Sequence, residues 1–235
     1  MSLQAAAKSA GDRVKTFHDR LPLLGPVIWW LSISYFVAQV YVSRVWKPHY
    51  SFIKNSISAL GATSCTPQMC SPRHAIMNAS FIVLGLVMAT GSLLICQEFR
   101  EKTPPDKWAA YIGFTGVAVA GLGALVVGLV PENTIGALHF TGAAMAIGVG
   151  NIGIGILGWR LKVLPAGLRW YMVVTSGIAF VAGGLFAFHA DLGIGAGLME
   201  RIGAYPEVVW LSIFGVYISV NHYAARTRPV ATVGA

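Results

Sequence analysis

The sequence predicts an all-α polytopic membrane protein, a bundle of six transmembrane helices. Of its 235 residues 55% are hydrophobic and only 11% are charged, and long uncharged stretches bounded by Lys or Arg recur along the chain. A hydrocarbon core about 30 Å thick requires about 20 apolar residues in a helix, because lipid offers the backbone no hydrogen-bond partner. Six such helices with short connections use nearly the whole chain, so we expect one membrane domain.

The elements follow one another in chain order. Residues 1–20 carry apolar positions at spacings of three and four with the basic residues off that stripe, which is typical of a cytoplasmic amphipathic segment. A frayed tail whose alanines mimic a period explains the pattern as well. The membrane domain covers residues 21–225, and 226–235 form a cytoplasmic tail. The spans are predicted at residues 21–43, 75–97, 108–130, 138–159, 170–189 and 208–225.

The basic residues predict the orientation. Twelve of the 17 Lys and Arg residues lie in the two tails and in the second and fourth connections, against five in the remaining connections. By the positive-inside rule both termini are cytoplasmic. The net charge of +8 then reflects topology, and no basic segment is both long and free of the bilayer. We therefore expect membrane lipids as partners and no nucleic acid.

Cysteine and glycine carry two further structural signals. Cys65 and Cys70 lie in the first outer connection, where an oxidising compartment favours a disulfide; a redox-catalytic pair would have two residues between its cysteines. A Gly-x-Gly-x-x-Gly string at 148–153 lies inside a span with no preceding strand, which argues against dinucleotide binding. Glycines at helical spacing predict close packing of spans three to five. These are Gly113 with Gly116, Gly121 with Gly128, Gly142 with Gly150, and Gly177 with Gly184.

Polar residues concentrate at the predicted outer face. The middle of the predicted spans carries almost nothing ionisable, which argues against a proton-coupled transporter or an ion channel. The outer ends and connections hold Lys54, Asn55, Ser56, Ser58, His74, Asn78, Glu132, Asn133, His139, His189, Asp191, Glu200, Arg201 and Glu207. Ionisable groups near hydrocarbon are costly unless they pair or face water, so we expect these side chains to share a hydrated pocket.

Three short motifs carry a resemblance to a known family. They are Asn-Ser-Ile-Ser-Ala-Leu-Gly at 55–61, Val-Pro-Glu-Asn at 130–133 followed by His139, and Gly-Leu-Met-Glu-Arg-Ile at 197–202. In order and spacing the chain resembles family 998 of domains of unknown function, six-helix membrane proteins of bacteria and archaea. The resemblance implies the six-helix architecture and a location in a prokaryotic plasma membrane. It implies no activity.

The outer histidines also suit a divalent metal such as zinc. Neutral imidazole and carboxylate are zinc ligands, and His74, His139, His189 and Asp191 supply them. The arrangement is loosely similar to the alkaline ceramidase and adiponectin receptor group of membrane hydrolases. It departs from that group, which has seven spans and a His-x-x-x-His pair on its last helix.

Two classes of function remain. In the first, the site is a metal-assisted hydrolase or transferase for a lipid or lipid-linked substrate, with Ser58, His139 and the general base Glu132 as catalytic residues. Its substrate-binding residues are predicted to be Lys54, Asn55, Asn78, Asn133, Glu200 and Arg201. In the second class the pocket binds a lipid, a small molecule or a partner protein without turnover. An uncoupled carrier is a third alternative.

Each of these residues also has a structural interpretation. His74 can cap a helix at the interface, and Glu132 with His139 can lock a loop to a helix. Glu200 and Arg201 can form an ion pair, and Ser56 and Ser58 can cap a short helical segment. Whether the side chains converge on one point separates these interpretations from a site.

Overall fold

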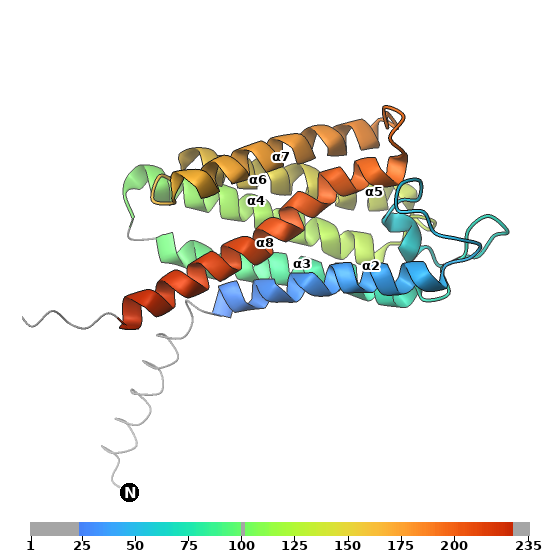
Figure 1. The fold of residues 1–235 in the computed structure, drawn as a ribbon, viewed down its shortest axis with the longest axis horizontal. Helices are drawn as coiled ribbons and strands as arrows, with labels where there is room; N and C mark the ends of the chain where they lie inside the picture. Colours follow the sequence, from blue (N-terminus) through green and yellow to red (C-terminus); the bar gives the residue numbers. More distant parts are fainter. Residues whose placement is uncertain (1–23, 100–101, 228–235) are drawn as a thin grey trace, which may run out of the picture.

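The computed structural model describes residues 24–99 and 102–227, and its regular elements there are helices (Figure 1). The predicted amphipathic segment at 1–20 lies outside these residues, as do residues 228–235 of the predicted tail. Six helices are long and apolar enough to cross a membrane, which confirms the predicted six-span all-α fold. They are Leu24–Val45, His74–Phe99, Pro104–Leu129, Gly136–Arg160, Ala166–Ala187 and Ala196–Asn221.

Several spans combine more than one helical element. The first contains the short helix η1 (Trp30–Ser32) and α2 (Ile33–Val45), and the second joins α3 (His74–Cys96) to η3 (Gln97–Phe99). The connection between them carries η2 (Ser58–Gly61). The remaining elements are α4 (Pro104–Leu129), α5 (Gly136–Ala144), η4 (Met145–Val149), α6 (Gly150–Arg160), α7 (Ala166–Ala187) and α8 (Ala196–Thr227).

The first five spans lie within a few residues of the prediction, but the sixth was placed wrongly. We predicted residues 208–225, whereas α8 begins at Ala196 and runs obliquely across the bundle (Figure 1). Glu200, Arg201 and Glu207 make the start of this helix look like an aqueous loop. All three are buried, at 5%, 4% and 3% exposure. They therefore lie inside a membrane-spanning helix and not in an outer connection.

The centre of the bundle is α4, which packs against α3, α5 and α6. A Cβ atom on Gly85 of α3 would come within 2.5 Å of the Gly121 carbonyl oxygen on α4, and one on Gly153 of α6 within 2.6 Å of the Gly113 carbonyl oxygen. Glycine permits these helix contacts. In span five the predicted glycines were wrong, because Gly177 and Gly184 are exposed and a Cβ on either would meet nothing within 4 Å; a close contact of this span is at Gly183, against Gly203 of α8.

The fourth span is interrupted by the π-helical segment η4 between α5 and α6. A π-turn accommodates one residue more than an α-turn and so rotates the face that follows it. His139 on α5 and Asn151 on α6 are both buried. The interruption lets one span turn both polar side chains toward the protein interior.

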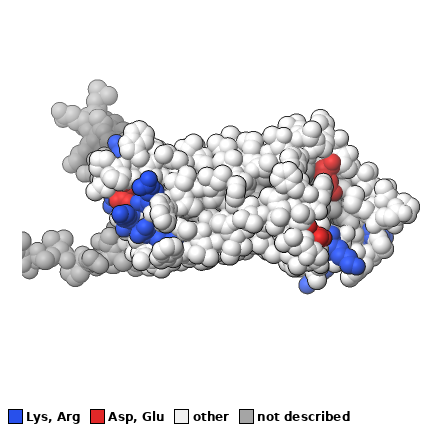
Figure 2. All heavy atoms as spheres, turned by 90° about the horizontal axis from the view of Figure 1, so that it is seen from above, with Lys and Arg blue, Asp and Glu red and all other residues white. Residues whose placement is uncertain are grey.

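Charged side chains gather at the two ends of the molecule and leave an uncharged band between them (Figure 2). We call the end with the connections 46–73, 130–135 and 188–195 the disulfide end, and the end with 100–103 and 161–165 the terminal end. Such a band is the surface that a bilayer requires. The spans therefore cross from the terminal end to the disulfide end, in alternate directions.

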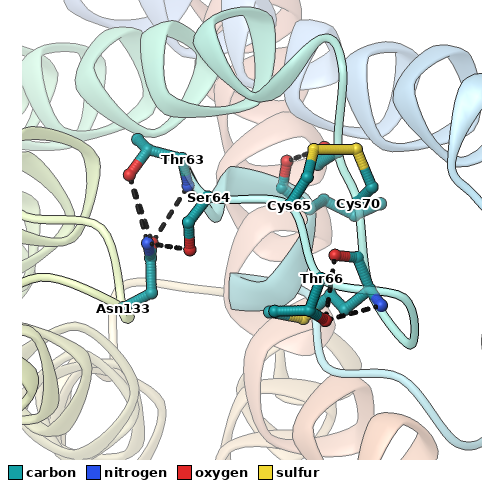
Figure 3. Close-up of a disulfide and its surroundings, with 9 residues drawn as sticks. Thr63, Ser64, Cys65, Thr66, Cys70 and Asn133 are labelled. Atoms are coloured by element: carbon teal, nitrogen blue, oxygen red, sulfur yellow. Dashed lines mark hydrogen bonds between the residues drawn. A yellow bond between two sulfur atoms is a disulfide. The ribbon is translucent and has the colours of Figure 1, made fainter.

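At the disulfide end, Cys65 and Cys70 form the predicted disulfide (Figure 3). Cys70 also pairs with Lys47 through two backbone hydrogen bonds of 3.0 Å, which join the two ends of the 46–73 connection. Asn133 reaches across from the short loop between α4 and α5. Its side chain binds the Thr63 backbone N–H at 3.0 Å and the Ser64 hydroxyl at 2.9 Å. The two loops are thus held together.

We predict that the disulfide end faces the outside of the cell. In a Cys96→Ala background, Lys54→Cys at the disulfide end should react with a membrane-impermeant maleimide in intact cells. Gly167→Cys, at an open and exposed position of the terminal end, should react only after permeabilisation. The reverse pattern would overturn the orientation derived from the positive-inside rule.

Candidate functional site

Arg201 of α8 holds the connection that follows the first span. Its guanidinium group donates to five acceptors, each a carbonyl or a phenol oxygen. They are the carbonyls of Phe52 (2.8 Å), Asn55 (3.0 Å) and Gly197 (2.7 Å) and the hydroxyls of Tyr50 and Tyr205. The guanidinium also lies over the Phe52 ring, 4.9 Å from its centroid. We call this set the Arg201 clamp.

Tyr50 completes the clamp from the loop side. Burial raises the pKa of Tyr50, so the phenol keeps its proton and can donate to the carbonyls of Asn55 (3.1 Å) and Ser56 (2.8 Å). Buried carbonyl groups need such donors, because an unsatisfied one costs about 1–3 kcal/mol. The backbone of residues 52–56 is therefore fixed against the N-terminal end of α8.

Glu200, the neighbour of Arg201, fixes the next two residues of the loop. Its carboxylate accepts the backbone N–H of Ile57, and its other oxygen lies 3.3 Å from the Ser58 hydroxyl. Ser58 begins η2 and is buried. The Arg201 clamp and Glu200 thus place the Ser58 side chain beside α8, inside the bundle.

His139 of α5 meets Ser58 from the opposite side. Its Nδ1 lies 2.7 Å from the Val130 carbonyl oxygen, and its Nε2 lies 3.0 Å from the Ser58 Oγ. A carbonyl can only accept, so Nδ1 carries the proton and Nε2 of the neutral ring is an acceptor. The Ser58 hydroxyl has one proton, which it can donate to His139 Nε2 at 3.0 Å or to Glu200 Oε1 at 3.3 Å, and the contact to His139 is the shorter of the two. This is the relation between a nucleophilic serine and its general base.

Glu132 lies beside this pair but contacts the previous serine. Burial raises the pKa of the Glu132 carboxyl, and a hydrogen bond with Ser56 opposes that rise. The geometry thus puts His139, and not Glu132, against the Ser58 hydroxyl. Glu132 is also close enough to act electrostatically on Glu200. The carboxyl groups of Glu132 and Glu200 therefore flank the segment that carries Ser56 and Ser58.

Ser58 and Glu200 open onto a cavity of about 50 Å³ inside the bundle. A space of this size holds a few water molecules. Most of its lining is apolar and comes from α3, α4, the fourth span and α8. Its polar lining consists of Ser58, Glu200, Tyr35 and Glu207. Of the polar residues predicted to share one pocket, Ser58, Glu200 and Glu207 line this cavity.

Among the other predicted binding residues, the three asparagines have structural partners. Asn78 donates to the Gly61 carbonyl at 2.9 Å, and the Asn55 side chain accepts the Ser51 N–H at 2.8 Å. Asn133 joins two loops, as described above, and Lys54 is exposed to solvent. Arg201 contacts the protein's own carbonyl and hydroxyl groups. These residues build the disulfide end around the site.

The predicted metal ligands do not converge. His139 uses both ring nitrogens for protein contacts, and His74 lies at the start of α3 with a buried Nδ1. His189 and Asp191 share a separate recess with Phe186. Within residues 24–99 and 102–227 no three His, Cys, Asp or Glu side chains are grouped to hold a metal. The structure thus gives the metal-assisted hypothesis no support.

The sequence did not reveal several residues of the site. Tyr35 lines the cavity, and Tyr205 links Arg201 to Gln39, whose side-chain oxygen it contacts at 2.8 Å. Aromatic and amide residues inside a span look like ordinary membrane sequence. The seven-residue spacing of Glu200 and Glu207 was the available signal, because it puts two carboxyl groups on one helical face. The burial of Glu200 and Glu207 within α8 also corrects the prediction that the middle of the spans carries almost nothing ionisable.

We predict that Arg201→Lys destabilises the protein strongly. A lysine ammonium is a point charge with three donors and cannot reach five acceptors, so the loss should be roughly 2–4 kcal/mol. Thermal unfolding in detergent measures it, with Arg44→Lys at an exposed position of α2 as the matched control. Equal unfolding temperatures for the two variants would contradict the role of the clamp.

We predict that Glu132→Gln stabilises the protein only at higher pH. Because the folded-state pKa is raised, Glu132 favours the folded state below its ordinary pKa, and this contribution is lost as pH rises through the folded pKa. Glutamine keeps a hydrogen-bonding side chain and never ionises. The variant should unfold near the wild-type temperature at pH 5 and above it at pH 8. A pH-independent difference between Glu132→Gln and the wild type would contradict this.

Comparison with known proteins agrees with this architecture. No curated protein and no solved structure matches the chain. The family described as "Protein of unknown function (DUF998)" matches residues 25–217. This range begins at the second residue of the first span and ends inside the sixth span, so it includes the four spans between them in full. This range covers Ser58, His139, Glu200 and Glu207. The chain therefore belongs to the DUF998 family of membrane proteins.

Proposed function

We propose that the protein is a membrane-embedded hydrolase or acyltransferase that acts on a lipid or lipid-linked ester. The observation that carries the proposal is the contact between Ser58 Oγ and His139 Nε2, with the ring tautomer set by the Val130 carbonyl. A serine hydroxyl is a weak nucleophile until a neighbouring base accepts its proton. His139 is positioned to be that base.

The reaction follows from these contacts. Ser58 Oγ forms a bond to the acyl carbon while its proton moves to His139 Nε2. The ester C–O bond then breaks, and the imidazolium returns the proton to the departing alcohol. Water, or an acceptor alcohol in a transferase, then loses a proton to the same nitrogen and bonds to the acyl carbon. The bond from the acyl carbon to Ser58 Oγ breaks, and His139 returns the proton to Oγ. The Val130 carbonyl stabilises the imidazolium by accepting from Nδ1–H.

The surroundings of Ser58 favour a lipid-like substrate. Its cavity is lined mainly by apolar side chains such as Leu84, Val127 and Ile147. It lies between membrane-spanning helices, and its apolar lining suits an acyl chain better than a polar substrate. Glu200 acts as a positioning residue, because it fixes the Ile57 backbone and so the direction of the Ser58 side chain.

We predict that a lipid-tailed fluorophosphonate labels Ser58 in the purified protein. The serine Oγ–P bond forms as fluoride leaves, and His139 accepts the proton. Ser58→Ala should abolish labelling, and His139→Gln should slow it by about a hundredfold or more. Ser80→Ala removes another buried serine, one that donates to the Met77 carbonyl, and should label as the wild type does.

Two results would oppose the proposal. Labelling of Ser58→Ala at the wild-type rate would place the nucleophile elsewhere. Absence of labelling in the wild type, together with a lipid that co-purifies unchanged, would support the alternative of a membrane protein that binds its ligand without turnover.

A further inference from the structure

Glu207 is a second carboxyl group in the cavity, deeper in the bundle than Glu200. It lies seven residues further along α8 and so on the same face, about two helical turns away. Its side chain is 3% exposed, and its Oε1 has no hydrogen-bond partner among the described residues. Neither the serine chemistry nor the Arg201 clamp uses this group.

The packing holds the Glu207 carboxyl group in place. A Cβ atom on Gly150 of α6 would overlap both Glu207 carboxyl oxygens and the carbon between them. Glycine at this position therefore makes room for the carboxyl group. The next residue, Asn151, donates its amide N–H groups to the carbonyls of Ile147 (2.8 Å) and Gly203 (3.2 Å). Protein groups thus surround Glu207 without satisfying Oε1.

The cavity lacks a positive charge to match its acids. Among the described residues that line it there are two glutamates and no lysine or arginine. The nearby guanidinium of Arg201 is committed to carbonyl and phenol oxygens of the clamp. A carboxyl group in a low-dielectric interior is costly without a donor or a counter-charge. A bound cation with N–H groups would supply both.

The rest of the lining indicates an organic cation. The rings of Tyr35 and Phe81 both line the cavity, with centroids 5.6 Å apart, and aromatic faces attract ammonium groups. Leu84, Met88 and Val208 offer apolar contact. A strongly hydrated inorganic ion would find few oxygens here. The size of about 50 Å³ admits a small headgroup.

We propose that this cavity is a binding site for a small alkylammonium ion, with Glu207 as its carboxylate partner and Tyr35 and Phe81 beside its alkyl groups. The site extends the cavity below Ser58 and does not depend on the proposed hydrolysis. It would hold either a free amine in its cationic form or the amino group of a larger amphiphile.

The test is calorimetric binding of n-butylammonium chloride to the wild-type protein in detergent. Saturable binding is expected, and Glu207→Gln should weaken it by about tenfold to a hundredfold, the range for a hydrogen bond to a charged group. Glu98→Gln, at an exposed carboxyl group of the terminal end, should bind as the wild type does. 1-Butanol and sodium chloride at the same concentrations should neither bind saturably nor displace butylammonium.

The outcomes decide between the alternatives. Equal binding of 1-butanol would show that the cavity is merely apolar, and displacement by sodium would assign it to inorganic cations; either overturns the proposal. Unchanged affinity in Glu207→Gln, or no binding by the wild type, also overturns it. Glutamine has nearly the same shape as glutamate, so Glu207→Gln is expected to fold. The comparison of butylammonium with 1-butanol uses wild-type protein and therefore tests the proposal even where the variant folds poorly. Fluorophosphonate labelling of Glu207→Gln separates this result from the fate of the Ser58 proposal.

Discussion

The site depends on one interaction, the hydrogen bonds from the Arg201 guanidinium to backbone carbonyls of the connection after the first span. That connection has few regular backbone hydrogen bonds of its own, and within a membrane protein each unsatisfied carbonyl is expensive. The guanidinium satisfies Phe52, Asn55 and Gly197 at once. Gly197 is required there, because a Cβ atom would overlap the Asn55 carbonyl. Only with this segment fixed do Ile57 and Ser58 meet Glu200 and His139.

The polar groups form two systems that share α8. In the first, neutral acceptors surround a permanent cation, so Arg201 is satisfied without consuming a carboxylate. In the second, Glu200 and Glu207 face the cavity without a fixed cation among its described lining. A buried Arg–Glu pair would have neutralised both partners and left an inert core. The separation leaves acidic groups beside the Ser58–His139 pair, where charge and proton transfer can be used.

The sequence was sufficient for the architecture because apolar length is a strong local signal. It failed where a span contains charge, because Glu200, Arg201 and Glu207 look like a loop. The partners of Glu200 and Arg201 in residues 50–58, which explain their burial, are more than 140 residues away. Ser58 and His139 were among the predicted catalytic residues, but their contact, 81 residues apart in sequence, was not predictable. The metal-ligand set rested on residue type alone, and residue type does not show that His189 lies in another recess.

The π-helical segment Met145–Val149 determines where the fourth span can lose a residue. His139 and Asn151 are twelve residues apart, which in an uninterrupted α-helix rotates one from the other by about 120°. One additional residue taken up by a π-turn reduces that angle to about 20°, so both can face inward. Loss of a single residue at 145–149 would restore a regular helix without changing either face. The fourth span can therefore absorb a one-residue deletion there, whereas the same deletion elsewhere between His139 and Asn151 would leave the π-turn and rotate one of the two side chains toward lipid.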